Sequence, residues 1–423
     1  MKFNCFPQHC VRLVVLAVGL HSSTAYSVQN SSASISQMMQ MNMQDHPQLQ
    51  ALKAELRSAK AQVRAANQAI FNPELELDYE ETDIETKSVG IRQTLDWGDQ
   101  RGSRTAAAQA QFNHAMASYE QAIQTLLKEQ LSRIAEYQTN QELKQLADEK
   151  LKLMLEFKQV SERRFEAGDL NQVERNLTQL SYSQAVMEQA NVNADAIEAR
   201  EALYVMFNNL PKELPHLPAE LPPPELESDL EKFIQQLPAV RQTIAEINSA
   251  RQTVKLRKSE TAWNPTIGLS AGKEGDENLV GVNLSFPLNI RNNYSAEVDS
   301  ANESLIAIEQ RAHIAFREIR ARIISTNGRY KALLHAWKNW QDKSRNSVDQ
   351  QLILVKKMWQ VGDISTADYL LQLKQALETK ATGIELRNQL WQVAFEWMSM
   401  VSTLDDWLNI EIETEILNKS ETK

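Results

Sequence analysis

Histidine, methionine and carboxylate side chains are the groups in this chain that could bind a metal or transfer protons. No two histidines stand four residues apart, so the zinc-ligand spacing of a helical site is absent. The sequence also contains no Gly-rich phosphate loop and no Gly-x-Ser-x-Gly nucleophile motif. We therefore predict that the chain is not an enzyme and binds no cofactor. The histidines beyond the N-terminal segment, all predicted to be solvated or packed, are His46, His114, His216, His313 and His335.

A methionine-rich segment offers the strongest candidate metal ligands. Met38, Met39, Met41 and Met43 precede His46, and thioether ligands suit Cu(I). The same side chains are flexible and apolar, so they could equally pack in front of the first predicted helix. Packing is the favoured interpretation and no metal site is predicted, but Cu(I) binding stays open.

Two Gly-Asp turns are the best candidates for a functional surface. Gly168-Asp169-Leu170 and Gly362-Asp363-Ile364 each follow a long predicted helix, where a glycine supplies the left-handed residue that ends a helix. Asn171 and Ser365 then stand at N-cap positions. An acidic residue follows each cap by three positions, as in a capping box: Glu174 and Asp368.

The N-terminus predicts export from the cytoplasm. Lys2 and Arg12 precede an apolar segment, Leu13 to Leu20, and small residues follow, so residues 1–25 are predicted to be a signal peptide. Both cysteines, Cys5 and Cys10, lie in this segment, which excludes disulfides and thiolate sites from the mature chain. Its loss would change the net charge from −10 to −12, because two of the 45 basic residues are removed and the 55 acidic ones remain. This balance argues against a nucleic-acid partner.

The chain is predicted to be an elongated, mainly helical protein built from a duplicated unit. Only 12 glycines and 12 prolines occur in 423 residues, and the 65 residues between Gly102 and Gly168 contain neither. A helix of that length would extend about 100 Å. The turn at Gly168 recurs 194 residues later at Gly362, and residues 71–77 recur in 263–269, 192 residues later. Three matches at nearly one offset, with residues 89–95 and 280–286 as the third, indicate an internal repeat.

The repeat sets the predicted domain boundaries. A first unit spans residues 26–210, a Pro-rich linker spans 211–238, a second unit spans 239–408, and a polar tail spans 409–423. The linker is expected to remain extended until Pro238, because seven prolines lie in it. In each unit a helix (near Gln48–Phe71, then near Ala239–Ala262) precedes two short strands, a very long helix, the Gly-Asp turn and a second long helix.

The four predicted strands alternate between apolar and polar residues. In the first strand, the polar residues Glu74, Glu76, Asp78 and Glu80 face opposite the apolar ones. In the second, Gln93 interrupts the apolar positions. The apolar positions of the first and fourth strands are predicted to face lipid: Leu75, Leu77, Tyr79, Val280, Val282, Leu284 and Phe286.

Four strands attached to helices this long need partner strands, since a two-stranded ribbon is marginal alone and a single-chain outer-membrane barrel has at least eight. Two copies would close a narrow, filled barrel, whereas three would give 12 strands and space for a channel. The predicted fold is therefore mainly α, with a small membrane β-barrel completed by a homotrimer. A long helical tube would continue it.

Several motifs resemble those of the TolC family of outer-membrane efflux proteins. The similarity extends from about Ile35 to Leu408, and Asn72-Pro73-Glu74-Leu75 with Gly98-Asp99-Gln100-Arg101 is most similar to the cobalt–zinc–cadmium resistance branch, where a second glycine is common at the position of Asp99. The other motifs are His46-Pro47-Gln48-Leu49, Gln93-Thr94-Leu95-Asp96-Trp97-Gly98, Ser285-Phe286-Pro287-Leu288 and the two Gly-Asp turns.

The resemblance implies a passive trimeric duct in the outer membrane with a long periplasmic α-helical extension. It implies docking to a periplasmic adaptor protein at the two turns, and an inner-membrane RND-type pump that selects the substrate, heavy-metal cations among the possibilities. It also implies that Asp368 faces a periplasmic gate, with Ile364 in place of the basic partner of well-characterised members. Two alternatives stay open: the outer duct of a type I protein-secretion system, and a periplasmic coiled-coil scaffold without a pore.

Overall fold

The structure is a computed structural model that describes residues 25–207, 210–211, 214–218 and 220–410. It gives side-chain environments from Ile35 onward. The predicted signal peptide up to residue 24, with both cysteines, and the polar tail beyond residue 410 lie outside the described residues.

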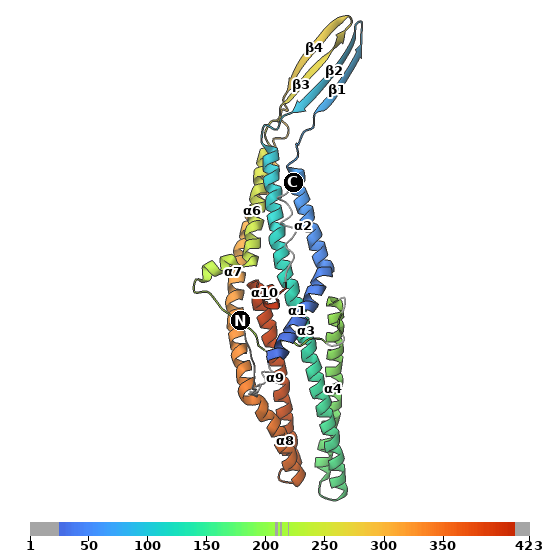
Figure 1. The fold of residues 1–423 in the computed structure, drawn as a ribbon, viewed down its shortest axis with the longest axis vertical. Coiled ribbons are helices and arrows are strands. Elements are labelled where there is room, and N and C mark those ends of the chain that lie inside the picture. The colour runs from blue at the N-terminus through green and yellow to red at the C-terminus, as the bar shows by residue number, and fades with distance from the viewer. Residues whose placement is uncertain (1–24, 208–209, 212–213, 219, 411–423) are drawn as a thin grey trace, which may run out of the picture.

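The molecule is a long rod with a sheet at one end and two helical hairpins at the other (Figure 1). Helices α2, α3, α6 and α7 form the upper part of the rod, below the sheet, and the hairpins α3–α4 and α8–α9 form the lower end. The helices of the first half are α1 (Ala25–Asp45), α2 (Pro47–Ala66), α3 (Gln100–Glu166) and α4 (Gln172–Met206). Those of the second half are α5 (Leu230–Gln236), α6 (Pro238–Ser259), α7 (Ser295–Asn339), α8 (Arg345–Val361), α9 (Thr366–Met400) and α10 (Leu404–Leu408).

The sheet joins the two halves of the chain. Its antiparallel strands are β1 (Glu74–Glu81), β2 (Glu85–Thr94), β3 (Thr266–Glu274) and β4 (Glu277–Ser285), and they lie side by side in chain order. The central pairing, β2 with β3, connects residues about 180 positions apart, such as Ile91 and Leu269. The predicted duplication thus appears as two hairpins that pair edge to edge.

Prolines set the starts of two helices. Pro47 and Pro238 each occupy the first turn of α2 and α6, where the missing N–H has no helical acceptor in any case. The predicted helices near Gln48–Phe71 and Ala239–Ala262 are therefore confirmed, although they end earlier, at Ala66 and Ser259.

The prediction that the linker stays extended until Pro238 is wrong for its last part. Residues 225–237 contain no proline, and the side chain of Asp229 accepts a hydrogen bond from the Lys232 amide, which caps α5. Ile234 and Leu237 are buried in the main core. An available cap and two apolar anchors are sufficient to form a short helix there.

Described residues in the earlier part of the linker contact the long helices. Gln138 on α3 donates to the Pro215 carbonyl at 2.8 Å and accepts from the Leu217 amide at 3.2 Å. The Tyr330 hydroxyl of α7 donates to the Pro222 carbonyl, and burial raises the pKa of this hydroxyl well above its usual value. The linker thereby becomes part of the core at the middle of the rod.

The predicted unbroken helix before the second turn contains a π-helical segment, Trp340–Ser344, between α7 and α8. The Trp340 ring lies against α9 at Gly383, where an added Cβ would come within 2.4 Å of the ring. A glycine is needed here because the indole occupies the space of a side chain. The extra residue per turn lets the lower part of the helix depart from the line of α7 (Figure 1).

No helix among the described residues is long and apolar enough to span a membrane.

Candidate functional site: the apolar sheet face and the helical tips

The cross-strand register collects the predicted apolar strand residues on one face of the sheet. Leu75, Ile91, Leu269 and Val282 are aligned across the four strands, and the next row is Leu77, Val89, Ala271 and Val280. We call this surface the apolar sheet face; Gln93, Ile267 and Leu284 continue it toward the helices.

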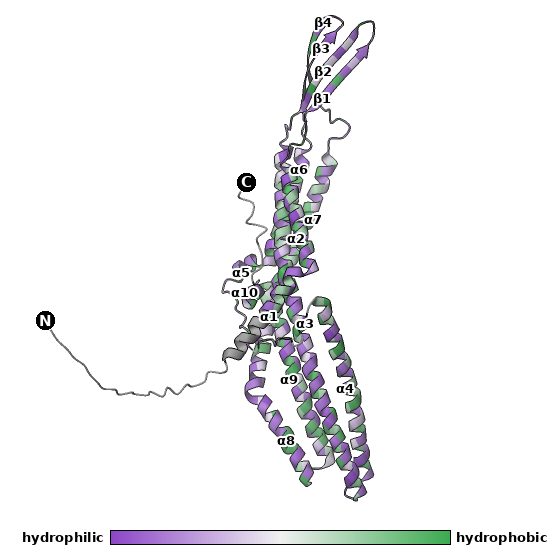
Figure 2. Ribbon diagram, turned by 45° about the vertical axis from the view of Figure 1, so that its right-hand side comes forward, coloured by the Kyte–Doolittle hydropathy of each residue, from purple (hydrophilic) through white to green (hydrophobic). Residues whose placement is uncertain are grey.

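The apolar residues of the apolar sheet face are exposed. Val280 is 80% exposed and Leu75 72%, and the remaining predicted lipid-facing residues, Leu77, Tyr79, Val282, Leu284 and Phe286, are each more than half exposed. Figures 1 and 2 both show the sheet projecting beyond the helices, with no described helix over either face. A contiguous apolar surface of this kind indicates an interaction partner.

The opposite face carries charge. The Arg92 side chain lies 3.4 Å from the carboxylates of both Glu74 and Glu76, and Ser88 donates to Asp78 at 3.1 Å. Figure 2 shows hydrophilic and hydrophobic residues alternating along the strands. The sheet is therefore amphipathic, as its sequence predicts.

Gln93, the exception in the apolar pattern, lies at the end of the sheet near the helices. Its side-chain amide donates to the Thr94 carbonyl at 2.7 Å and to the Phe71 carbonyl at 3.3 Å. Its polar group is thus satisfied by the backbone that enters and leaves the sheet, and does not face the apolar rows unpaired.

The outer edges of the sheet are open. In the part of the chain that the structure describes, β1 and β4 each pair with one neighbour only. Their outer N–H and C=O groups can bond to further strands. The sheet therefore has the geometry of a segment that further copies could extend.

The loop from β2 to α3 contains Asp99, at the position where the cobalt–zinc–cadmium resistance branch commonly has a second glycine. Asp99 adopts a left-handed backbone with φ of 47°, a conformation that glycine takes more easily. Its carboxylate accepts from the Gly102 amide at 3.2 Å, and Asp96 accepts from the Gln100 amide at 2.8 Å. Asp99 therefore caps the first turn of α3, and this hydrogen bond offsets the cost of its left-handed backbone.

The two tips end their helices as predicted. Gly168 and Gly362 have φ of 83° and 84°. The residue after each glycine donates back into the preceding helix, Asp169 to Arg164 and Asp363 to Met358, both at 2.9 Å. This is the Schellman arrangement, in which a left-handed residue satisfies the last carbonyls. At both tips Leu170 and Ile364 turn inward, since Leu170 is buried and Ile364 packs on the nearby core.

Both predicted N-caps are confirmed. The Asn171 side chain accepts from the Glu174 amide at 3.0 Å, and the Glu174 carboxylate accepts from the Asn171 amide at 3.2 Å. Ser365 accepts from the Asp368 amide at 3.1 Å, and its hydroxyl donates to the Asp368 carboxylate at 2.7 Å. Asp368 is exposed and lies beside the helix start. Capping accounts for these contacts within one chain, and a gate role for Asp368 stays a prediction.

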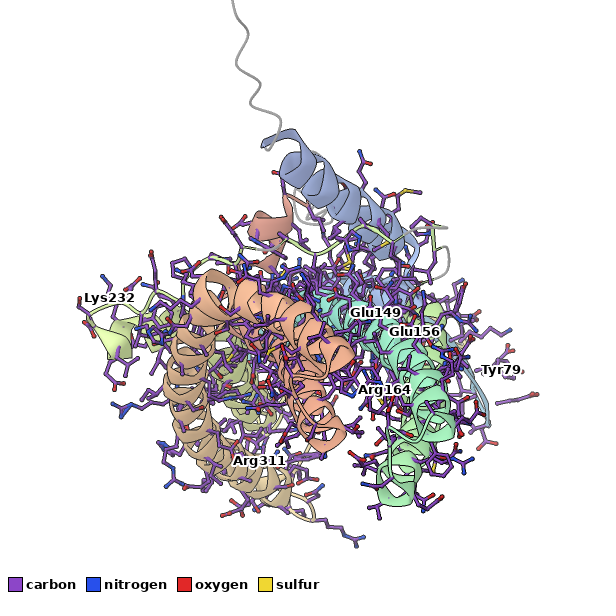
Figure 3. All side chains as sticks on the ribbon, turned by 90° about the horizontal axis from the view of Figure 1, so that it is seen from below. Tyr79, Glu149, Glu156, Arg164, Lys232 and Arg311 are labelled. Atoms are coloured by element: carbon purple, nitrogen blue, oxygen red, sulfur yellow. The ribbon has the colours of Figure 1, made fainter. Side chains whose placement is uncertain are left out.

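Arg164 joins the two tips, a contact that the sequence did not predict. Its guanidinium lies 4.9 Å from the centre of the Trp359 ring and donates to the carbonyls of Trp359 and Gln360 at the end of α8. Seen from the hairpin end in Figure 3, Arg164 lies between the two hairpins.

An aromatic cluster lies next to this contact. Its ring centres are 4.6–5.0 Å apart, and its members are Trp359, Phe157 and Tyr369. Burial, with Glu156 nearby, raises the pKa of the Tyr369 hydroxyl to about 12.

The methionine segment lies in α1. Met39 and Met43 are buried in the main core, and Gln130 contacts the Met43 sulfur at 3.8 Å. Burial lowers the pKa of the neighbouring His46, which favours its neutral form. These contacts support packing, the favoured interpretation, and Cu(I) binding stays an open alternative.

The fold, mostly helical with a small antiparallel sheet, is shared with solved TolC-like outer-membrane channels. Residues 38–209 match the model of the outer membrane efflux protein family. The predicted resemblance is confirmed over these residues, and so is the predicted mainly α fold with a small antiparallel sheet; the proteins that share the family model and the fold are channels and not enzymes.

The chain is also similar to individual proteins of this kind. The chain is 25% identical over 276 residues to the cobalt-zinc-cadmium resistance protein CzcC of Cupriavidus metallidurans; the match covers 61% of this chain and 65% of CzcC, just under two thirds of its length. Among solved structures, the outer-membrane channel OprN superposes with a TM-score of 0.73 at 12% identity, over 90% of this chain and 93% of OprN. The open MtrE channel of Neisseria gonorrhoeae gives 0.68 at 16% identity, over 94% and 97% of the two chains.

Proposed function

We propose that this protein is the outer-membrane duct of an efflux system, through which substrates pass from the periplasm to the exterior. The observation that carries the proposal is the apolar sheet face: a four-stranded amphipathic sheet that projects from a rod of helices, exposes its apolar residues and has two open edges. In water this face would be an aggregation hazard. In lipid it is the expected outer surface of a barrel.

A homotrimer is the assembly that fits this sheet. Three copies of the four-stranded sheet would supply 12 strands and leave an interior wide enough for a channel. The charged face with Glu74, Glu76 and Arg92 would then line water, and the apolar sheet face would meet lipid. The hairpins α3–α4 and α8–α9 would extend into the periplasm.

Heavy-metal cations are the proposed substrates. The similarity to CzcC supports this choice, and so does the excess of acidic residues in the chain, since a negatively charged conduit concentrates cations. An inner-membrane RND-type pump would select the cargo, because the duct itself has no group of three or more metal-ligating His, Asp or Glu side chains among its described residues.

The tips are the proposed docking surface for a periplasmic adaptor. Gly168-Asp169-Leu170 and Gly362-Asp363-Ile364 lie at the end of the rod opposite the sheet (Figure 1). A partner that links the duct to an inner-membrane pump would approach this end.

A strain that lacks this chain tests the proposed function. Loss of the chain should lower the concentrations of cobalt, zinc and cadmium that stop growth, and the wild-type chain should restore them. The purified protein should form discrete conductance steps in a planar bilayer. A protein without conductance would be a scaffold, and unchanged metal tolerance with a defect in protein export would indicate a type I secretion duct.

Replacing Asp368 with asparagine tests the gate hypothesis. In a trimer, three Asp368 carboxylates could surround the axis, attract cations and bind a divalent ion. Asp368→Asn keeps the shape and removes the charge. We expect bilayer recordings of the wild type to show cation preference and block by divalent ions from the periplasmic side, and the variant to lose most of the block.

Glu174→Gln is the matched control, because Glu174 has the same position after the N-cap at the other tip. It should leave the block unchanged. Equal block in the wild type and Asp368→Asn would leave Asp368 with its capping role alone.

A further inference from the structure

The apolar sheet face changes its chemistry at the end farthest from the helices. The register aligns Tyr79, Lys87, Lys273 and Asn278 across the four strands, directly beyond the row of Leu77, Val89, Ala271 and Val280. We call these four residues the terminal row. Residues two apart on a strand share a face, so both lysines lie on the apolar side of the sheet.

Two lysines directly opposite each other are an unfavourable pair in an isolated sheet. Lys87 and Lys273 are cross-strand partners, and like charges in this relation destabilise a sheet. The Lys87 ammonium lies 2.5 Å from a Glu85 carboxylate oxygen and 5.6 Å from the centre of the Tyr79 ring. Lys273 is exposed, and no described residue forms an ion pair with it. Glu85 already compensates the charge of Lys87, so an anion placed over the row would chiefly compensate Lys273.

The terminal row lies where an outward-facing apolar band would end. Leu95, the residue after β2, lies eight positions beyond Lys87, a rise of about 27 Å in an extended chain, or about 21 Å if the strand tilts by about 40°. The apolar band of a membrane barrel is roughly 25 Å tall. The end near the helices is bounded by exposed aromatic residues, Trp97, Trp263 and Phe286. The far end is bounded by a tyrosine and two lysines.

We propose that the terminal row binds the phosphate groups of an anionic lipid in the outer leaflet of the membrane. This inference depends on the proposed function, since it requires the sheet to lie in a bilayer. The lysine stems can lie along the apolar rows while the ammonium groups reach the headgroup level, and a tyrosine suits the same depth. Facing lysines on adjacent strands present two cations to one phosphate.

The surrounding charges restrict the level at which a phosphate can bind. The next pair outward on this face is Glu81 opposite Glu85, so the lysines form a narrow positive level between the apolar rows and the acidic hairpin end. The Tyr79 hydroxyl already donates to Glu81 at 2.9 Å, and Lys87 is paired with Glu85. Lys273 is therefore the main group that recognises the lipid, with Lys87 as the second cation beside it. A trimer would present three such rows around its circumference.

The test uses the full chain purified in detergent and a phosphorylated glucosamine glycolipid, diphosphoryl lipid A, with its phosphate-free form as the comparison. Bound lipids are counted by native mass spectrometry across a titration. Lys87→Gln/Lys273→Gln should bind the phosphorylated lipid about 30-fold more weakly than the wild type, because each lysine near an anionic surface contributes roughly a fivefold change in affinity. Binding of the phosphate-free lipid should not change.

Lys152→Gln/Lys357→Gln is the control for net charge, since both residues are exposed on the hairpins far from the sheet; it should bind like the wild type. Equal affinity of the terminal-row variant and the wild type for the phosphorylated lipid overturns the proposal. Incorporation into zwitterionic vesicles is measured in parallel. A wild type that does not enter vesicles refutes the membrane duct together with this inference, whereas normal incorporation with unchanged lipid affinity refutes the inference alone.

Discussion

Leu284→Arg is expected to remove most of the protein from the outer membrane. Leu284 pairs with Ile267 on the apolar sheet face and is 59% exposed. A charged side chain on a lipid-facing strand costs about 2–4 kcal/mol at mid-bilayer and less toward the interfaces. Leu284 lies between the middle row of the apolar sheet face and its end near the helices, so the cost is smaller than the mid-bilayer value, but a trimer would incur it three times. We expect at least a tenfold loss of heat-modifiable trimer from the outer-membrane fraction, measured by gel mobility with and without boiling.

Ser285→Arg is the matched control. Ser285 is the next residue on β4, is also exposed and pairs with Thr266 on the opposite face. Its arginine would point to water inside a barrel and should be tolerated. If the sheet lay in water, both arginines would be solvated and the two variants would behave alike. Equal assembly of Leu284→Arg and Ser285→Arg would therefore contradict the barrel.

The features that sequence reasoning predicted are those set by local chemistry. Alternation with a period of two assigns Leu75 and Glu74 to opposite faces whatever their neighbours are. A glycine after a long helix predicts the left-handed residue at Gly168, and Asn171 predicts the following cap. Each of these signals lies within a few residues, so no knowledge of the tertiary structure is needed.

The features that were missed depend on residues far apart in the chain. Arg164 contacts the end of α8 about 195 positions away, and nothing near Arg164 in the sequence indicates that partner. The π-helical segment at Trp340 has no glycine or proline to mark it and is matched by Gly383 on another helix. Helix α1 was missed because its methionines resemble an irregular apolar segment until the core that buries Met39 is known.

The register of the sheet could be predicted only in part from the sequence. Alternation in each strand predicts which residues share a face, but only the pairing of β2 with β3 brings Lys87 opposite Lys273. A shift of one residue would send every side chain of a strand to the other face. The apolar rows therefore specify the register, and the register in turn creates the terminal row.

Gly362→Val is expected to abolish efflux while the trimer remains in the membrane. Gly362 has φ of 84°, and no atom lies within 4 Å of the position that a Cβ would take. The substitution thus causes no clash with neighbouring groups, and its effect must arise from the backbone. A β-branched residue resists positive φ at a cost of about 1–2 kcal/mol, which is enough to rearrange one turn but small beside the buried core of the rod. Substrate export and the amount of outer-membrane trimer should be measured in the same cells.

Two controls separate backbone geometry from side-chain bulk. Gly328→Val adds the same side chain inside α7, where the Cβ also meets nothing within 4 Å and φ is not positive; it should export normally. Gly362→Asn should restore much of the activity, because asparagine tolerates the left-handed conformation. Full export by Gly362→Val would mean that the adaptor does not dock on this turn. Loss of export by both Gly362→Val and Gly362→Asn, at normal trimer levels, would instead mean that the adaptor needs a tip without a side chain, since the asparagine variant keeps the backbone and the valine variant does not.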